Sequence, residues 1–331
     1  MKLSLIVLNY NGVHLLQEYF DSVFKQTLLP DEIIMLDNNS SDDSVAFVEK
    51  NYPKVTIIKN SRNEGTAGGS NKAFTYAKGK YIIFQSNDMR LEKNCVKGLY
   101  DAITSDNTIG ICTSILLKNT PDKKGIHRID NAGGIVDIFG FGMQKYPTKL
   151  LEEIPEQESV FFSYGGSFII SKELFKKIKG YDERFFTLND DIDLSWRVRL
   201  LGYDIIYTKK SIIYHKVSAT LGPLFERPTK RYWSERNTIA TLIKNHTLPT
   251  LLVNGSIYLI LLCAEMGYFM YRNRFDLFSA DLKAILWNIK ELPETLRRRS
   301  KIQNMKKKDI SLAFERKSIK LSLFNDLKQV L

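Results

Sequence analysis

Three aspartates, Asp190, Asp191 and Asp193, stand within four positions of one another and are followed by Trp196 and Arg197. Carboxylates this close repel one another and resist joint burial, so a purely structural role would need several compensating partners. The same repulsion raises the pKa of a carboxyl group toward neutral pH, which suits a base that deprotonates a hydroxyl group. A solvated helix N-terminus, where aspartates are also favoured, is the alternative interpretation.

Two further residues could handle a cation. Asp88 stands just after a short apolar run, and His215 stands alone beyond the three aspartates. Carboxylate oxygens bind hard divalent cations, and an imidazole can add a ligand. The layout suits an enzyme that holds a divalent metal and a diphosphate while another carboxylate removes a proton. A lone histidine is more often structural, so the sequence around His215 leaves both roles open.

Strand-like and helix-like segments alternate along the chain, and they must position these side chains. Apolar runs predict strands at 3–8, 32–36, 55–59 and 81–84, with further strand-like runs at 205–207 and 212–214. Helical spacing of apolar residues predicts helices at 15–24, 44–51 and 68–77. This βαβα order predicts an α/β fold with an open, mostly parallel sheet and helices on both faces.

Polar clusters follow three of the predicted strands, at residues 9–12, 37–40 and 86–88. Each cluster alone could be an ordinary turn or helix cap. In open parallel sheets, however, ligands bind beyond the carboxyl ends of the strands, and all three clusters belong to that edge. A ligand site is therefore expected there. A dinucleotide site is disfavoured, because no GxGxxG motif follows the first strand.

The composition indicates a globular protein, since 44% of the 331 residues are apolar and 26% are charged. Cys95, Cys112 and Cys263 are scattered outside any metal-binding spacing, so we expect buried small hydrophobic residues rather than disulfides or a zinc site. The first residues lack the pattern of a signal peptide, and we expect the catalytic part to lie in the cytoplasm.

The charge is unevenly distributed. Residues 1–208 hold 25 Lys/Arg against 27 Asp/Glu, whereas residues 209–331 hold 23 against 10. The basic part adjoins the most apolar stretch, residues 248–271, which favours an anionic membrane surface over nucleic acid as its partner. Glu265 interrupts that stretch, so interfacial or re-entrant insertion is expected above a full span. A buried core or dimer helix is the alternative. The basic runs 297–299 and 306–308, with Lys301, would lie against the leaflet.

A series of motifs resembles a known family. In chain order they are Leu8-Asn9-Tyr10-Asn11, Leu36-Asp37-Asn38-Asn39-Ser40-Ser41-Asp42, Asn63-Glu64-Gly65 with Ala67-Gly68-Gly69-Ser70-Asn71, Ser86-Asn87-Asp88, Gly165-Gly166-Ser167, Gly180-Tyr181-Asp182-Glu183-Arg184, the acidic segment with Trp196-Arg197, and His215 with Ser218. The chain resembles the family 2 glycosyltransferases with the GT-A fold, most closely their rhamnosyltransferase-like branch. The resemblance implies a nucleotide-binding half at 1–100 and an acceptor-binding half at 101–245. Residues 246–331 match only in character, as an amphipathic, basic, membrane-associating helical region.

The resemblance implies a nucleoside-diphosphate sugar as donor, linked to UDP or dTDP. Asp37 would accept the imide N–H of a uracil or thymine, while Asn9 and Tyr10 would line the base. The remaining residues of the implied nucleotide site are Asn38, Asn63, Gly68, Asn71 and Asn87.

A divalent cation, Mg²⁺ or Mn²⁺, is also implied, bridging the diphosphate and held by Asp88 and His215. Ser86 departs from the family pattern, in which Asp or Asn is usual at that position. With a single carboxylate here, affinity for the metal without donor is expected to be weak.

By the same resemblance, Asp191 would be the base of an inverting transfer, and Asp190 is the second choice. Arg236 and Asn237 are expected near the phosphates of donor or acceptor. The implied acceptor-contacting residues are Gly165, Gly166, Asp193, Trp196 and Arg197. Of these, Trp196 could form a platform for a sugar, although a tryptophan at this helical spacing is more often a core residue.

The sequence thus predicts a membrane-associated, inverting, metal-dependent glycosyltransferase of cell-envelope polysaccharide biosynthesis. Its acceptor is expected to be a growing glycan on a polyprenyl-phosphate carrier at the cytoplasmic face of the membrane, with the enzyme peripheral or monotopic and a homodimer left open. One alternative is a catalytically degenerate nucleotide- or glycan-binding scaffold of a glycan assembly complex, for which Ser86 is the hint. The other is a sugar nucleotidyltransferase, which normally needs a basic glycine-rich loop where this chain has residues 9–12.

Overall fold

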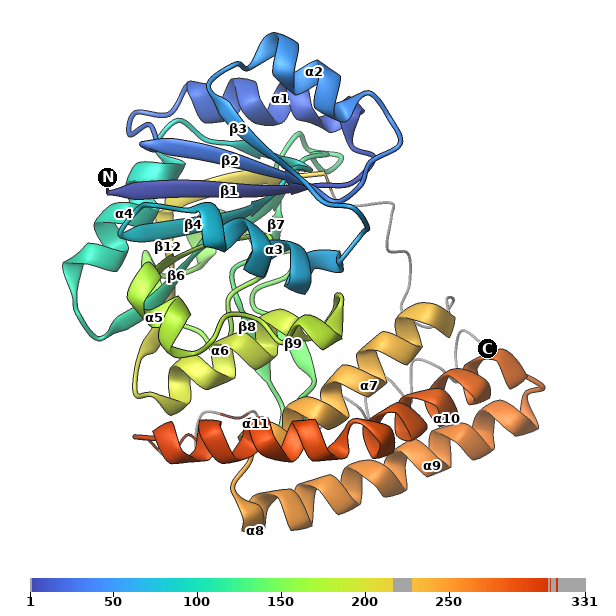
Figure 1. Ribbon diagram of the computed structural model, residues 1–331. Helices are drawn as coiled ribbons and strands as arrows, with labels where there is room; N and C mark the ends of the chain where they lie inside the picture. Colours follow the sequence, from blue (N-terminus) through green and yellow to red (C-terminus); the bar gives the residue numbers. More distant parts are fainter. Residues whose placement is uncertain (1, 217–227, 309, 311–313, 315–331) are drawn as a thin grey trace.

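The computed structural model describes residues 2–216, 228–308, 310 and 314. Figure 1 shows a central sheet with helices on both faces and a unit of long helices from the C-terminal third below it. The mixed, mostly parallel sheet confirms the predicted α/β fold. Ser218, one of the residues that carried the resemblance, lies outside the described part of the chain.

Within the described residues, ten strands form the main sheet, in the order β10-β12-β6-β11-β4-β1-β2-β3, with β5 paired to β12 and β7 paired to β6. Strand β1 pairs in parallel with β2 and with β4, so the carboxyl ends of these three strands meet at one edge. The strands of the main sheet are β1 (Leu3–Asn9), β2 (Glu32–Asp37), β3 (Val55–Lys59), β4 (Tyr81–Ser86), β5 (Met89–Leu91), β6 (Ile109–Lys118), β7 (Ile129–Asn131), β10 (Gln157–Ser159), β11 (Ser167–Ser171) and β12 (Asp204–His215). A separate hairpin consists of β8 (Gly134–Val136) and β9 (Gly142–Gln144).

Two groups of helices surround this sheet. The helices that cover its two faces are α1 (Val13–Phe24), α2 (Ser44–Asn51), α3 (Gly65–Tyr76), α4 (Cys95–Ser105), α5 (Lys172–Lys177) and α6 (Asp190–Leu200). The C-terminal helices are α7 (Pro228–Asn245), α8 (Leu248–Thr250), α9 (Ser256–Tyr271), α10 (Phe275–Lys290) and α11 (Leu292–Met305), with a π-helical turn at Leu251–Gly255 between α8 and α9.

Alternation along β1 explains the two layers of core. Leu5 packs in the cluster that contains Phe20 of α1, whereas Ile6 packs in the cluster that contains Phe175 of α5 and Leu194 of α6. Figure 1 shows α1, α2 and α4 on one face of the sheet and α3, α5 and α6 on the other. A strand buried on both faces must be apolar throughout, which is why the runs in this part of the chain were readable from the sequence.

Two predicted boundaries differ from the structure. Helix α3 begins at Gly65 rather than at residue 68, because the Gly65 N–H donates to Asn63 Oδ1 at 2.9 Å and starts the helix earlier. The two strand-like runs near residue 210 are a single strand, β12, with a register shift between Thr208 and Ile212. The bulge lets one long strand pair first with β6 and β10 and then with β6 and β5.

Helix α7 joins the C-terminal unit to the sheet domain. It packs against α6 on one side and against α10 and α11 on another. The predicted boundary at residue 245 falls at the end of this shared helix. The cysteine prediction is right for Cys95 and Cys112, which are buried, and wrong for Cys263, which is exposed on α9. Cys263 lies outside the buried face of α9, which consists of Tyr258, Leu262, Glu265, Met266 and Phe269.

Candidate active site

Asp37, at the end of β2, lies at the centre of a buried polar cluster. Its Oδ1 accepts from Asn9 Nδ2 at 2.9 Å and from Ser40 Oγ at 2.6 Å, and its Oδ2 accepts from the Ser40 N–H at 2.9 Å. Asn87 Nδ2 donates to Asn9 Oδ1 at 2.7 Å and ties in the end of β4. The three sheet-edge clusters predicted from the sequence therefore meet. Asp37 Oδ2 retains a lone pair with which it can accept one more hydrogen bond.

Other predicted nucleotide residues divide into exposed and structural ones. Tyr10 is 53% exposed beside the Asp37 cluster, and Asn63 is half-buried. Asn38 is buried, donates to the Gly65 carbonyl at 3.0 Å and accepts from Asn60 Nδ2 at 2.8 Å. Asn38 thus braces the loop before α3 against β2, while Tyr10 and Asn63 have surface that a ligand can reach.

Two predictions in the nucleotide half need correction. Both amide atoms of Asn71 bond to the backbone of Tyr181, with Nδ2 donating at 2.9 Å and Oδ1 accepting at 2.8 Å. Asn71 therefore joins α3 to the loop after α5, and both its nitrogen and its oxygen are already bonded to the protein backbone. Gly68 does not leave room for a ligand either, since an added Cβ would lie 2.9 Å from Cβ of Glu64.

Asp88 and His215 come together as predicted, with a third residue. His215 Nε2 lies 3.4 Å from Asp88 Oδ2, and its Nδ1 lies 2.8 Å from Asp130 Oδ2. Burial by itself lowers the pKa of His215, but hydrogen bonds and charge attraction from Asp130 and Asp88 outweigh it and raise the pKa to about 9. The side chain is thus an imidazolium at neutral pH, held between two carboxylates.

The residues around Asp88 fit one part of a metal site. Asp88 Oδ1 is buried and has no hydrogen-bond partner in the described structure, so this oxygen can serve as a cation ligand. His215 is paired with Asp88 and Asp130 in this arrangement, so it could bind a cation only after losing the proton that these carboxylates favour. Among the residues described, no group of three or more His, Cys, Asp or Glu side chains is placed to hold a metal ion. A cation would be held by Asp88 with oxygens from a bound diphosphate and water.

Asp190 and Asp191 begin α6 and differ in their partners. Asp190 Oδ2 accepts from Thr66 Oγ1 of α3 at 2.9 Å, whereas Asp191 Oδ2 accepts from the Gly165 N–H at 3.3 Å. Burial raises the pKa of Asp190, and the adjacent Asp191 charge raises it further. Burial also raises the pKa of Asp191, although the Ile192 and Gly165 N–H groups partly offset this. Both groups are suited to exchange a proton close to neutral pH.

Tyr164 marks the common centre of the two groups of acids. Its ring meets the His215 ring edge to face, with centroids 5.9 Å apart. Burial raises the pKa of the Tyr164 phenol, and four surrounding acids raise it further: Asp88, Asp130, Asp191 and Asp190. The candidate cation ligand and the candidate base therefore face the same space, at the carboxyl end of β4 and the amino end of β11.

The loop before Asp190 is strained and is held by α7. Three non-glycine residues in it, Phe186, Leu188 and Asn189, have positive φ angles of 63°, 67° and 62°. Asn237 Nδ2 donates to the carbonyl oxygens of Phe185, Thr187 and Leu188, and Arg236 Nη2 donates to those of Arg184 and Phe185. Arg236 and Asn237 were predicted to stand near phosphates. They instead fix the backbone that leads into the candidate carboxylates, Asp190 and Asp191.

Three of the residues predicted to contact the acceptor are buried: Asp193, Trp196 and Arg197. Asp193 is bonded to Arg197 Nε at 3.0 Å, to Lys244 Nζ at 2.9 Å and to Asn245 Nδ2 at 3.0 Å. Trp196 packs edge to face on Phe161. The next turns of α6 after Asp191 face α7 and the interior, so these side chains position the helix and cannot reach an acceptor.

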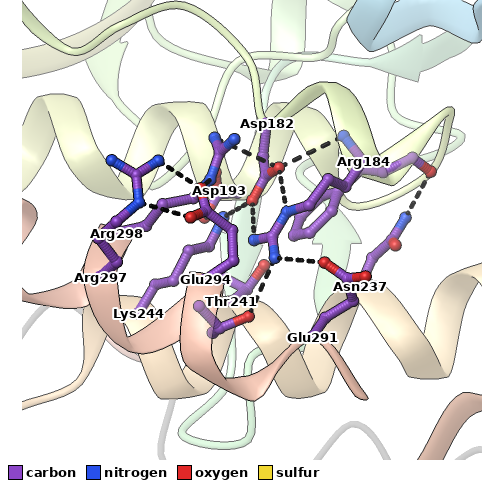
Figure 2. A network of polar contacts seen from close by, with 12 residues as sticks. Asp182, Arg184, Asp193, Asn237, Thr241, Lys244, Glu291, Glu294, Arg297 and Arg298 are labelled. Atoms are coloured by element: carbon purple, nitrogen blue, oxygen red, sulfur yellow. Dashed lines mark hydrogen bonds and ion pairs between the residues drawn. The ribbon is translucent and has the colours of Figure 1, made fainter. Parts of the chain in front are cut away.

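Figure 2 shows that Asp193 belongs to a larger ionic network between the sheet domain and the C-terminal helices. Asp182 is at its centre, with Lys244 Nζ at 2.7 Å, Arg184 Nη2 at 2.8 Å and Arg298 Nη1 at 3.4 Å. Lys244 bridges Asp182 and Asp193. These charges lock α6, α7 and α11 together, so the C-terminal unit is part of the support of the site.

The predicted glycine pair has two different surroundings. Gly165 faces Asp191, and an added Cβ would lie 3.3 Å from Cβ of that residue. At Gly166 an added Cβ would lie 2.5 Å from Cε of Met89 and 2.6 Å from Cε1 of Tyr164. Gly166 therefore makes room for protein side chains, and only Gly165 borders the candidate base.

Comparison with known families agrees with this geometry. The model of the family "Glycosyl transferase family 2" matches residues 4–179, which is more than half of the chain. A second family model, "Glycosyl transferase family group 2", matches residues 148–289. The chain belongs to glycosyl transferase family 2. The resemblance inferred from the motifs is thereby confirmed at the level of the family.

Curated relatives of this family 2 chain are glycosyltransferases by name. The cholesterol galactosyltransferase of Borreliella burgdorferi is 29% identical over 35% of this chain and 33% of its own length. The β-1,3-glucosyltransferase WfgD of Escherichia coli, named as acting on UDP-Glc and α-D-GlcNAc-diphosphoundecaprenol, is 28% identical over 32% of this chain and 49% of its own length. The O-antigen chain rhamnosyltransferase WbaN of Salmonella anatum is 26% identical over 68% and 69%. The chain thus spans less than half the length of the first two.

Solved structures show the same fold. GalNAc-T7, solved with UDP, GalNAc and Mn²⁺, superposes with a TM-score of 0.57 at 18% identity over 74% of this chain and 48% of that chain. The mannosyltransferase PcManGT of Pyrobaculum calidifontis, solved with GDP-Man and Mn²⁺, gives 0.55 at 15% identity over 87% of each chain. These likenesses confirm that the family 2 chain has the GT-A type of fold.

Sequence reasoning missed three residues of this family 2 site. Asp130 bonds to the His215 ring, and Thr66 donates to Asp190. Tyr164 lies among the four acids of the site. A signal existed for Tyr164, which directly precedes the glycine pair. Asp130 and Thr66 carried no such signal, because an acid in a short strand and a threonine at a helix start are ordinary in any fold.

Proposed function

We propose that the chain is an inverting glycosyltransferase that moves a sugar from a UDP- or dTDP-sugar to a growing glycan on a polyprenyl carrier, at the cytoplasmic face of the membrane. The observation that carries the proposal is the position of Asp191. It lies between the nucleotide half, through the Thr66–Asp190 contact, and the Gly165 backbone of the acceptor half. Family membership supports the transfer reaction, and the named substrates of WfgD support a lipid-linked acceptor.

Asp191 acts as the general base in this proposal. The acceptor hydroxyl attacks the anomeric carbon on the face opposite the diphosphate, and its proton passes to a carboxylate oxygen of Asp191 as the new C–O bond forms and the bond to the diphosphate oxygen breaks. The raised pKa of Asp191 makes it a stronger base than an ordinary aspartate. Asp190 is held by Thr66 and keeps the pair of acids in place.

The leaving diphosphate gathers negative charge near Asp88. Asp88 offers Oδ1 to a divalent cation, which when bound would neutralise that charge. The His215 imidazolium holds Asp88 in position from the other side. At the far end of the donor, Asp37 Oδ2 accepts the imide N–H of the base, and the exposed Tyr10 ring covers the base.

The test is release of nucleoside diphosphate from a panel of UDP-, dTDP- and GDP-sugars by the purified full chain, with and without membrane extract that contains lipid-linked glycan. We expect release from one UDP- or dTDP-sugar, increased by the extract. Asp191→Asn should lower turnover by roughly 100-fold or more, in line with the usual contribution of general-base catalysis. The matched control is Asp101→Asn, a surface acid on α4 that forms an ion pair with Lys97, and this variant should keep full turnover.

Donor binding separates an enzyme from a catalytically degenerate scaffold. A donor at 100 times its dissociation constant stabilises the folded chain by about 2.7 kcal/mol, which a thermal-shift measurement detects. A thermal shift without any release of nucleoside diphosphate, in the presence of Mn²⁺ and extract, would assign the chain to the scaffold class. Wild-type turnover in Asp191→Asn would move the base to another residue.

A further inference from the structure

The segment Leu248–Tyr271 forms a continuous helical rod whose exposed side carries no charge. It is 24 residues long, which corresponds to about 36 Å at the α-helical rise. Glu265 is its only charged residue, and it is buried. Ile260 is 67% exposed and Tyr271 is 81% exposed. Exposed apolar surfaces of this extent on a folded protein mark a site of interaction with a partner or a membrane.

The opposite side of the rod is fixed to the protein. Arg231 of α7 donates to Glu265 at 3.0 Å and makes two bonds to Asp281 of α10, at 2.7 and 2.9 Å. The Tyr258 hydroxyl bonds to Glu235 of α7, and the Arg231 guanidinium lies 4.7 Å from the centroid of the Phe269 ring. A buried ionic cluster thus holds one side of α9 against α7 and α10.

Helix α10 packs on α9 and adds a second exposed apolar stripe. The stripe has the spacing of one helical face, and its members are Phe275, Leu282, Leu286 and Ile289. Lys283 and Lys290 are exposed next to it in sequence, and neither forms an ion pair with a described residue. An apolar stripe bordered by unpaired lysines is the pattern of a helix lying in the interface of an anionic leaflet.

We propose that the docking surface, meaning the exposed side of Leu248–Tyr271 with the α10 stripe, lies flat on an anionic lipid leaflet and does not cross it. The length and composition of the rod would allow a span, but a span would separate Glu265 from Arg231 and carry an acid into the hydrocarbon. Figure 1 shows α9 on the side of the helical unit away from the sheet, so docking leaves the carboxyl edge of the strands open.

Charge favours a leaflet over a second copy of the chain as the occupant. Residues 209–331 carry 23 Lys/Arg against 10 Asp/Glu, so two copies brought together through this part of the chain would repel each other. An anionic leaflet is attracted by the same charges. The proposal stands on this surface alone and does not depend on the transfer reaction.

The first experiment is flotation of the purified full chain with vesicles of neutral phosphatidylcholine, or of phosphatidylcholine with phosphatidylglycerol. We expect flotation with the anionic vesicles and partial retention in high salt, because salt screens charge but not apolar burial. The double variant Ile260→Asp/Leu286→Asp should lower the bound fraction by roughly tenfold or more. Lys283→Gln/Lys290→Gln should lower binding at low salt and flatten its salt dependence. Leu29→Asp, an exposed apolar position outside the surface, is the matched control and should float like the unchanged chain.

The second experiment distinguishes a flat rod from a spanning one. Cys263 is exposed on α9 while Cys95 and Cys112 are buried, so a thiol-reactive fluorophore labels one position of the folded chain. Two further labelled positions come from Leu252→Cys and Met270→Cys in a Cys263→Ser background. Quenching by lipids brominated at different depths should give the same shallow depth at all three positions. A depth that increases toward the bilayer centre at Cys263 and falls again at either end shows a span and overturns the proposal.

Further outcomes also decide against the proposal. If the chain ignores vesicles and forms a dimer that Ile260→Asp dissociates, measured by light scattering, the surface belongs to a second copy. Equal flotation of the double Asp variant and the unchanged chain would place the lipid contact elsewhere. Hydrolysis of donor by each variant in the absence of vesicles is measured in parallel. A variant that loses vesicle binding but still hydrolyses the donor shows that the docking surface and the transfer site act independently.

Discussion

Asn237 of α7 donates its side-chain amide to the carbonyl oxygen of Leu188 at 2.7 Å, and so fixes the loop that leads into Asp190 and Asp191. The same amide nitrogen reaches the carbonyl oxygens of Phe185 and Thr187. A loop with several residues in the left-handed region persists only where its surroundings hold it. A helix at the junction with the C-terminal unit thereby positions the candidate base.

We expect Asn237→Ala to lower kcat by roughly 100-fold, because a displacement of about 1 Å at a reacting group costs this much, while KM for the donor stays nearly unchanged. Steady-state kinetics with the donor varied would show this split. Asn51→Ala, which removes an exposed amide bonded to the Phe47 carbonyl, is the control. A proportional rise in KM with kcat unchanged would show that α7 serves donor binding instead.

Asp190→Asn should stabilise the fold at neutral pH. Burial and the Asp191 charge raise the pKa of Asp190 in the folded state above its unfolded value, so the folded state binds more protons in the window between the two values. Stability then falls as pH rises through that window, and the neutral amide removes this loss. Thermal unfolding from pH 4 to 8 should show a higher Tm for the variant only at the upper end. An equal shift at pH 4 would point to a packing effect.

The acid limb of the pH–rate profile should follow the same pair. Transfer needs the deprotonated base, so kcat should fall as pH is lowered through the raised pKa of Asp191. Asp190 has the higher pKa of the two and is uncharged while Asp191 titrates, so Asp190→Asn should leave the acid limb nearly in place. A pH series of kcat for both proteins measures this. A clear shift of the acid limb to lower pH in Asp190→Asn would show that Asp190 is charged when the base titrates.

Asp88 should control how strongly donor binding and activity depend on a divalent cation. Asp88→Asn removes the negative charge of the carboxylate that has an unpartnered oxygen in the described structure, so it should weaken donor binding in Mn²⁺ and abolish most of the response to added metal. Ser86→Asp adds an oxygen ligand at the same strand end and should lower the Mn²⁺ concentration needed for half-maximal activity. Calorimetric titration of donor at several Mn²⁺ concentrations tests both. Full activity of Asp88→Asn in excess chelator would show that transfer needs no metal.

Lys244 should be a large contributor to stability. Its ammonium bridges the buried carboxylates of Asp182 and Asp193, and Lys244→Met would leave two buried charges without it, which costs about 3–5 kcal/mol. Lys97→Met, at an exposed pair with Asp101, should cost about 1 kcal/mol or less. Urea unfolding of both variants measures the difference.

The same network makes a pH prediction. Although burial opposes ionisation, Lys244 and Arg184 hold the pKa of Asp182 far below its usual value in the fold. That stabilisation is present above the ordinary pKa of an aspartate, about 3.9, and is lost as pH falls below it. Urea unfolding near pH 3 should therefore show a smaller effect of Lys244→Met than unfolding at pH 7.

The sequence by itself determined the sheet, its carboxyl edge and the residue types gathered there. Strands buried on both faces must be apolar throughout, and polar residues that follow them must lie at one edge, so Asn9, Asp37 and Asp88 could be placed together without coordinates. The functional importance of the acidic start of α6 could also be predicted, because close carboxylates repel one another and destabilise the fold unless they have a function or a partner.

Only the tertiary structure decided which side of each element meets which neighbour. Asp190 and Asp193 are three residues apart on one helix, yet the first meets Thr66 beside the site and the second is buried against Lys244. From the sequence, Asn71 and Asn237 were predicted to bind ligand groups. In the structure, Asn71 bonds to a backbone group more than a hundred residues away in the chain, and Asn237 bonds to one about fifty residues away. Hydrogen bonds between such distant segments depend on how helices pack, and no local periodicity encodes that packing.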